Sequence, residues 1–134
     1  NMDDIAGNLG LAQIKHIEWI LERFHQNGRR YDALLENTPG IKILRRDPLD
    51  YQTYWGYTVL VENRNTVIDA LDEAGIDAAP IHGRNDRYSM FTADSREFPN
   101  TDWFDDRELS IPCGWWLKED DQARIIEILK KVAR

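Results

Sequence analysis

The sequence of 134 residues has few of the side chains that build disulfide, redox or metal sites. Its one cysteine is Cys113, and its three histidines, His16, His25 and His82, are widely separated. A single thiol cannot form an internal disulfide, and a zinc site needs about four converging Cys, His or carboxylate ligands. We therefore expect neither a disulfide framework nor a metal site in this chain.

Positive charge is also scarce. Lysine and arginine together number 17 against 24 aspartates and glutamates, which gives a formal net charge of −7. A protein whose main task is to neutralise a phosphate backbone is normally basic. The balance therefore argues against nucleic-acid binding, whereas a small anionic ligand needs only a local basic cluster.

Long apolar runs and complete catalytic motifs are absent from the sequence as well. No run approaches the roughly 20 residues of a membrane span, and the chain opens without the apolar region of a signal peptide. There is no glycine-rich phosphate loop, no G-x-S-x-G and no H-E-x-x-H. The sequence thus predicts an acidic, cytoplasmic protein without a self-contained catalytic signature.

Residues 1–36 have the periodicity of a helix that leads into the rest of the chain. Glycines at 7, 10 and 28 each weaken a helix interior by about 1 kcal/mol relative to alanine, so we expect two helices or one bent helix. The apolar positions that recur every three or four residues are Leu11, Ile14, Ile17, Leu21, Phe24, Tyr31, Leu34 and Leu35.

Residues 37–134 are predicted to form a small α/β (α+β) domain. Asn63 or Asn65 is expected to cap a helix that ends at Gly75. Alternating aromatic and β-branched residues predict that the central strand is covered at least partly on both faces. The expected architecture is a long N-terminal helix and a short mixed sheet with helices on one face. Extended segments are predicted at 41–45, 54–62, 76–80 and 109–111, a helical turn at 100–104 and a final helix at 119–131.

The segment from His82 to Pro99 is polar and has no clear period. A loop of this length is uncommon inside a compact domain unless it binds something. Arginine presents a planar fork to phosphate or carboxylate, and histidine can bond a sugar hydroxyl or a phosphate. The alternative is an exposed polar turn with solvated charges. The candidate ligand contacts in this segment are His82, Arg84, Asn85, Arg87 and Ser89.

Cys113 and the pair Trp115-Trp116 are interpreted as packing residues. A cysteine that follows a proline in a strand-to-turn position is more often a small buried residue than a nucleophile. Adjacent aromatics on an extended chain point in opposite directions, so one tryptophan can face a partner or ligand while the other enters the core. Core or subunit packing is the expectation for both, and the sequence does not decide between these roles.

Five stretches of the sequence occur in an order that is typical of one enzyme family. They are MDDIAGNLGLAQI from Met2, ER from Glu22, RYDALL from Arg30, YWGYTV from Tyr54, and LSIP from Leu109 followed by Leu117, Glu119 and Asp120. As a set they resemble the DegT/DnrJ/EryC1/StrS sugar aminotransferases, which are fold-type-I enzymes dependent on pyridoxal phosphate (PLP). The loop that begins at His82 and the later Gly114-Trp115-Trp116 resemble one branch of that family. Each motif is weak alone, but their order along the whole chain makes the resemblance specific.

The resemblance implies that the chain is the C-terminal third of such an enzyme, that is, its small domain. The family's Schiff-base lysine and the aspartate that pairs the pyridine nitrogen lie upstream of this segment. Asn1 stands beside the family's phosphate-binding asparagine and not on it. We therefore expect no catalytic, cofactor-binding or metal residue in this chain, which is predicted to be inactive alone. None of the five lysines lies in a matching context: Lys15, Lys42, Lys118, Lys130 and Lys131.

For the complete enzyme, the resemblance implies transamination of a keto-sugar nucleotide by a PLP-dependent homodimer, with glutamate or glutamine as amino donor. The small domain would then close over the site, and the loop that begins at His82 would contact the substrate. The alternative function is a stand-alone, non-catalytic module that binds a nucleotide sugar or drives oligomerisation.

Overall fold

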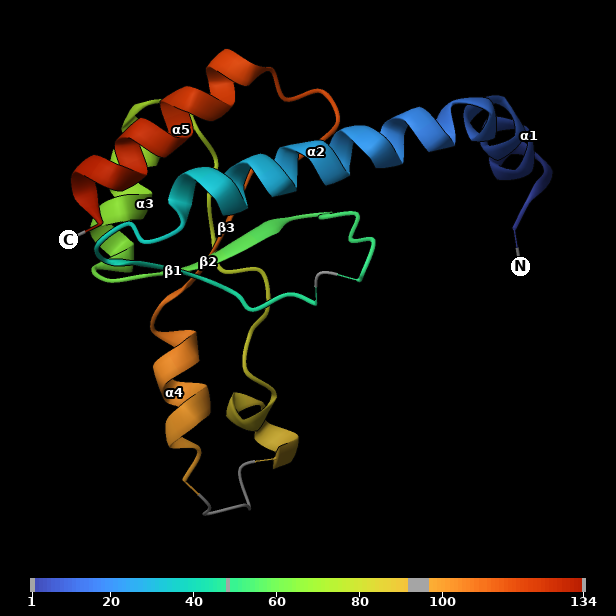
Figure 1. Cartoon of the computed structure of the whole chain (residues 1–134). Helices are drawn as coiled ribbons and strands as arrows, with labels where there is room; N and C mark the ends of the chain where they lie inside the picture. Colours follow the sequence, from blue (N-terminus) through green and yellow to red (C-terminus); the bar gives the residue numbers. More distant parts are fainter. Residues whose placement is uncertain (1, 48, 92–96, 134) are drawn as a thin grey trace.

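The computed structural model of the chain describes residues 2–47, 49–91 and 97–133. A small sheet lies at the centre, a long helical segment extends away from it, and a two-stemmed projection points to the other side (Figure 1). The elements in chain order are α1 (Asp4–Gln13), η1 (Ile14–His16), α2 (Ile17–Leu35), β1 (Ile41–Ile43), β2 (Tyr57–Val61), α3 (Arg64–Glu73), η2 (Asn85–Arg87), η3 (Ser89–Phe91), α4 (Pro99–Asp105), β3 (Glu108–Ile111) and α5 (Glu119–Val132).

The sheet has the strand order β1-β2-β3, and both pairings are antiparallel. The α+β class is confirmed, but the expectation of a mixed sheet is wrong for these three strands. The segment after α3 contributes only a single antiparallel bridge, from Ala79 to Ser110 on β3. Because β2 and Ala79 both run antiparallel to β3, they run in the same direction with β3 between them. The extended segments predicted before and after α3 are therefore separated in the sheet by β3, which comes later in the chain.

The central strand is shorter than its aromatic run predicts. β2 begins at Tyr57, because Tyr54 has a positive φ of 36° and leaves the extended conformation. The ring of Tyr54 lies against α2 at Gly28, where a Cβ atom would come within 2.3 Å of it. Trp55 is 77% exposed, so the predicted cover of this face does not extend to it.

The N-terminal helical segment bends, as predicted, at the 3-10 turn η1 and not at a glycine. Asp3 caps α1, and its side chain accepts a hydrogen bond of 2.7 Å from the Ala6 N–H. The second half of α2 packs on the sheet through Tyr31 and Leu35, which are both 0% exposed. The first half of the apolar stripe behaves differently: Leu11 is 68% and Ile14 63% exposed. The apolar positions of this helical segment therefore do not share one environment, because α1 leads away from the sheet (Figure 1).

One core joins α2, α3 and α5 to a single face of the sheet. Tyr57, Val59 and Val61 point into it from β2, and all three are fully buried. Each large apolar side chain buried in this way contributes about 1.5–3 kcal/mol to stability. Gly75, with φ of 71°, ends α3 as expected and lets the Ile76 N–H bond the Leu71 carbonyl at 2.9 Å. Within the described ranges, no helix is both long and apolar enough to cross a membrane.

Candidate functional site

Residues 82–91 and 97–107, here called the arm, form the projection on the side of the sheet away from α5 (Figure 1). One stem carries η2 and η3, and the other is α4. A cavity of about 360 Å³, here called the arm pocket, lies at its base. Its lining residues are Arg64, Pro80, His82, Gly83, Arg84, Arg87, Tyr88 and Asp105.

The arm pocket brings together three of the five candidate contacts predicted from the sequence: His82, Arg84 and Arg87. Asn85 and Ser89 are exposed and do not line it. Arg64 and Asp105 were not predicted as site residues. They come from α3 and α4, so no local sequence signal connected them with the segment that begins at His82.

Arg84 is the most constrained charge in the arm. Its Nε and Nη2 atoms form a fork to the Asp86 carboxylate at 2.9 and 2.5 Å, and its Nη1 atom pairs with Asp102 on α4. Its side chain is only 9% exposed. Hydrogen bonding to Arg84 lowers the pKa of the Asp86 carboxyl. Arg84 therefore holds the two stems together and is already occupied by carboxylates.

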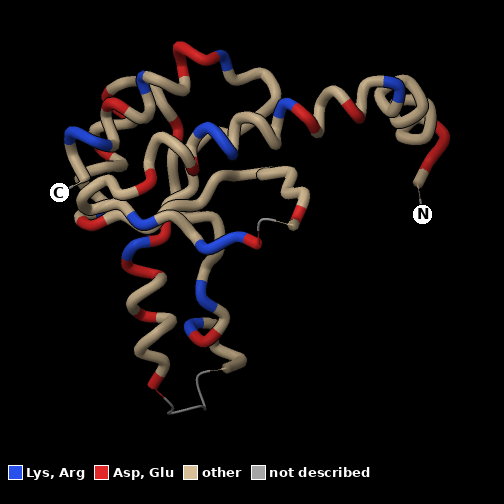
Figure 2. The backbone as a smooth tube through the Cα atoms, viewed as in Figure 1, with Lys and Arg blue, Asp and Glu red and all other residues tan. Residues whose placement is uncertain are grey.

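The other two arginines of the arm pocket also have partners within the chain. Arg87 Nη2 lies 2.9 Å from an Asp105 carboxylate oxygen, although the Arg87 side chain is 64% exposed. Arg64 Nη1 donates to the Asp105 and Glu108 carbonyls. Figure 2 shows acidic positions along α4 and arginines mainly on the η2 stem. The arm is therefore not the basic loop that its sequence from Arg84 to Arg87 suggests.

A second polar cluster lies between α2 and the start of β2. The Asp32 carboxylate accepts hydrogen bonds from Tyr57 at 2.6 Å, Tyr54 at 3.1 Å and Arg46 Nε at 3.1 Å. The Arg46 guanidinium also lies 4.9 Å from the centroid of each tyrosine ring. Burial, and then the bond to Asp32, raise the pKa of Tyr57. These residues tie the loop before β2 to α2. The sequence signal for Asp32 was its place in RYDALL, and that for the two tyrosines was YWGYTV.

Polar contacts also tie the segment after β3 to α2. Asn27 Nδ2 donates to the Gly114 carbonyl at 2.9 Å, and Tyr31 donates to the Pro112 carbonyl at the same distance. Cys113 is 2% exposed, and burial raises the pKa of its thiol to about 12. The interpretation of Cys113 as a packing residue is confirmed, since a buried thiol of this pKa is not a ready nucleophile.

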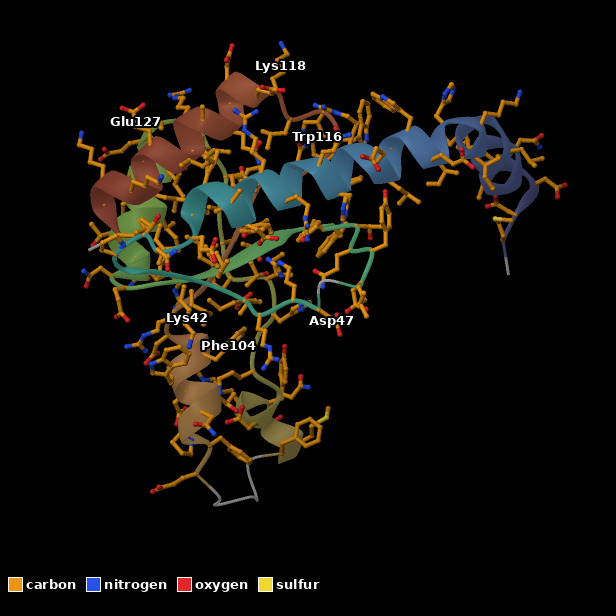
Figure 3. The ribbon with its side chains drawn as sticks, viewed as in Figure 1. Lys42, Asp47, Phe104, Trp116, Lys118 and Glu127 are labelled. Atoms are coloured by element: carbon orange, nitrogen blue, oxygen red, sulfur yellow. The ribbon has the colours of Figure 1, made fainter. Side chains whose placement is uncertain are left out.

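Neither Trp115 nor Trp116 enters the core. They are 40% and 64% exposed, and they lie along the first half of α2, as Figure 3 shows for Trp116. Trp115 meets Trp19 edge to face at 5.6 Å between ring centroids, and Trp116 meets Phe24 at 6.4 Å. The expectation of core packing is wrong for both, while subunit packing stays a prediction.

The lysines of this chain are unlike a lysine that binds PLP covalently. All five lysines are exposed, including Lys42 and Lys118 in Figure 3. A lysine that binds PLP covalently needs a closed pocket that lowers its pKa. In the part of the chain that the structure describes, no three His, Cys, Asp or Glu residues cluster as metal ligands.

Comparison with known proteins assigns the chain to a family. The model of the DegT/DnrJ/EryC1/StrS aminotransferase family matches residues 1–130. An uncharacterised protein of Methanocaldococcus jannaschii, MJ1066, is 25% identical over 98% of this chain and 37% of its own length. The spore coat polysaccharide biosynthesis protein SpsC of Bacillus subtilis is 27% identical over 100% of this chain and 37% of its own length.

Solved structures show the same fold. Sugar aminotransferase CalS13 of Micromonospora echinospora superposes with a TM-score of 0.91 at 30% identity, over 97% of this chain and 35% of that one. The sugar aminotransferase Spr1654 of Streptococcus pneumoniae, described as putative, was solved in its PMP form. It gives a TM-score of 0.87 at 25% identity, over 99% of this chain and 35% of that one. These matches confirm the predicted fold, and this chain spans little more than a third of each relative.

Proposed function

The chain belongs to the DegT/DnrJ/EryC1/StrS aminotransferase family, and we propose that it is the C-terminal small domain of a PLP-dependent aminotransferase acting on a keto-sugar nucleotide. The observation that carries this proposal is the unequal coverage. The match to CalS13 takes in 97% of this chain but only 35% of that enzyme. In this proposal the rest of the enzyme supplies the lysine site that this chain lacks.

The division of labour follows from the side chains present. Bound PLP supplies the electron sink for transamination and is held by the longer protein outside this chain. The arm pocket supplies substrate contacts through His82, Arg87 and Tyr88, while Arg84 fixes the shape of the arm. Asn85 and Ser89, on the exposed side of the arm, are proposed as further contacts once the site is complete. We further propose that the longer protein is a cytoplasmic homodimer that uses glutamate or glutamine as amino donor.

The exposed apolar residues of α1 and of the start of α2 also support a longer protein. Ile5 is 75% and Trp19 55% exposed, and no residue of α1 is buried. Covering a large apolar side chain contributes up to about 1.5–3 kcal/mol, and isolated folded chains rarely leave a continuous patch of this kind. The exposed apolar residues from Met2 to Trp19 are Met2, Ile5, Leu9, Leu11, Ile14, Ile17 and Trp19.

The test is to compare the 134-residue chain with the protein encoded by the complete reading frame that contains it. The longer protein is expected to bind PLP with visible absorbance that disappears when glutamate or glutamine is added. The 134-residue chain is expected to be colourless and inactive. A colourless longer protein would contradict the proposal. A chain that binds a nucleotide sugar as tightly as the longer protein would favour the stand-alone module instead.

A further inference from the structure

The arm pocket has no excess of positive charge. Three arginines approach it, Arg64, Arg84 and Arg87. Three carboxylates pair with the last two of them: Asp86 and Asp102 with Arg84, and Asp105 with Arg87. The side chain of Glu108, which accepts a hydrogen bond of 3.3 Å from the Ile81 N–H, adds a further buried carboxylate beside this set. The formal charges therefore cancel or leave a slight negative excess.

A diphosphate would have to compete with these carboxylates. The guanidinium of Arg84 already binds Asp86 through Nε and Nη2 and Asp102 through Nη1, and its side chain is 9% exposed. Of the two arginines that pair with carboxylates, only Arg87 is exposed, and a phosphate oxygen that bound it would leave Asp105 without this partner. Because the charges of this set already cancel or are slightly negative, two more negative charges gain no net attraction from it.

The remaining polar groups of the arm pocket are uncharged or weakly basic. The Tyr88 hydroxyl lies beside the backbone of Gly83, where a Cβ atom would be 3.5 Å from it. His82, which precedes Gly83 in the sequence, is exposed and also lines the arm pocket. A phenol and an imidazole both donate and accept hydrogen bonds, as the hydroxyl groups of a sugar require.

We propose that the arm pocket binds the uncharged, hydroxyl-bearing sugar ring of the substrate and not its diphosphate. His82 and Tyr88 bond the sugar hydroxyls, and Arg84 is a positioning residue that shapes the pocket through Asp86 and Asp102. This assignment rests on the proposed function, because it takes the ligand to be a nucleotide sugar. It also explains why an arginine-rich loop is so completely paired with acids.

The experiment measures dissociation constants by calorimetry on the longer protein, with four probes: UDP, dTDP, UDP-glucose and dTDP-glucose. Attached glucose is expected to tighten binding at least tenfold for one of the two nucleotides. His82→Ala and Tyr88→Phe should remove most of that gain, while they change the affinity for the free diphosphate less than twofold. Arg87→Gln should likewise change the dissociation constant of the free diphosphate less than twofold. Arg124→Gln on α5 is its matched control outside the arm pocket.

Arg84→Lys tests the positioning role, because lysine keeps the charge but cannot form the bidentate pair with Asp86. It should lose the gain in affinity from the attached glucose, as His82→Ala does, and leave the affinity for the free diphosphate unchanged. Full retention of the gain in Arg84→Lys would overturn the positioning role.

Two results would overturn the ligand assignment. If Arg87→Gln weakened the binding of the free diphosphate at least tenfold while Arg124→Gln did not, the arm pocket would bind the diphosphate. If no arm variant changed the affinity for any of the four probes, the ligand would not enter this pocket. Both outcomes differ from failure of the proposed function, which shows itself as a longer protein without the visible absorbance of PLP.

Discussion

Two regions of the N-terminal helical segment are both rich in apolar residues and have opposite environments. In the second half of α2, Tyr31 and Leu35 are 0% exposed and pack on the sheet. In α1 and η1, Leu11 and Ile14 stand at helical spacing yet are 68% and 63% exposed. The spacing of apolar residues shows which side of a helix needs cover. It does not show whether the covering surface belongs to the same stretch of chain.

The sharpest test of this contrast is a cavity in the core. Leu129→Ala removes a fully buried side chain of α5 and should destabilise the chain by about 2–5 kcal/mol, because it loses burial and leaves a void. Leu11→Ala, its control on the uncovered helix, should change stability by less than about 0.5 kcal/mol. Urea unfolding of the 134-residue chain measures both. Equal losses would contradict the division into a packed and an uncovered region.

The uncovered face should behave differently in the longer protein. The double variant Ile5→Ser, Leu11→Ser is expected to leave the 134-residue chain nearly unchanged. In the longer protein it should cost about 3 kcal/mol, if each side chain is covered there. Thermal and urea unfolding of both lengths measure the difference. The same small effect in both would mean that nothing covers this face.

Two glycines extend the comparison to small residues. Gly28→Ala should destabilise the chain by about 1–3 kcal/mol, because a Cβ atom there would come within 2.3–2.5 Å of the Tyr54 ring. Gly10→Ala should stabilise it by about 1 kcal/mol, since a Cβ atom there would meet nothing outside its own stretch of helix within 4 Å and alanine favours a helix. A loss of stability in Gly10→Ala would show that α1 is packed in solution.

The smallest effect concerns pH and the buried phenols. Burial raises the pKa of Tyr31 and of Tyr57 above the ordinary phenol value. Above pH of about 10 the unfolded chain loses these protons while the folded chain keeps them, so stability falls as pH rises. Tyr57→Phe should reduce this fall by less than about 1 kcal/mol between about pH 9 and pH 10.5. Urea unfolding across that range measures it, and an identical slope in the variant would show that Tyr57 ionises in the folded chain.

Local signals predicted many of the elements. The strand at Ile41, the final helix after Lys118 and the left-handed end of α3 at Gly75 all depend on neighbours in the sequence. The start of β2 was not predictable in this way, because Tyr54 leaves the strand to place its ring on Gly28 of α2. The antiparallel sheet was missed for a similar reason, since β3 enters between two segments that precede it in the chain.

The candidate site divides in the same manner. His82, Arg84 and Arg87 are close in sequence, so their approach to one pocket could be anticipated. Asp102 and Asp105 come from α4, and their pairing with the two arginines depends on how the arm folds back. Tyr88 was not predicted as a contact, because an aromatic residue in a polar segment carries no signal of its own.

The sequence by itself determined the family, the apolar periodicity and the absence of a matching lysine context, because these are properties of residue order. Only the tertiary structure decided that the arginines of the arm are paired with carboxylates, that Cys113 is buried and that the apolar residues of α1 are uncovered. Charge pairing and burial depend on atoms brought together from distant positions, and those contacts form only when the whole chain has packed.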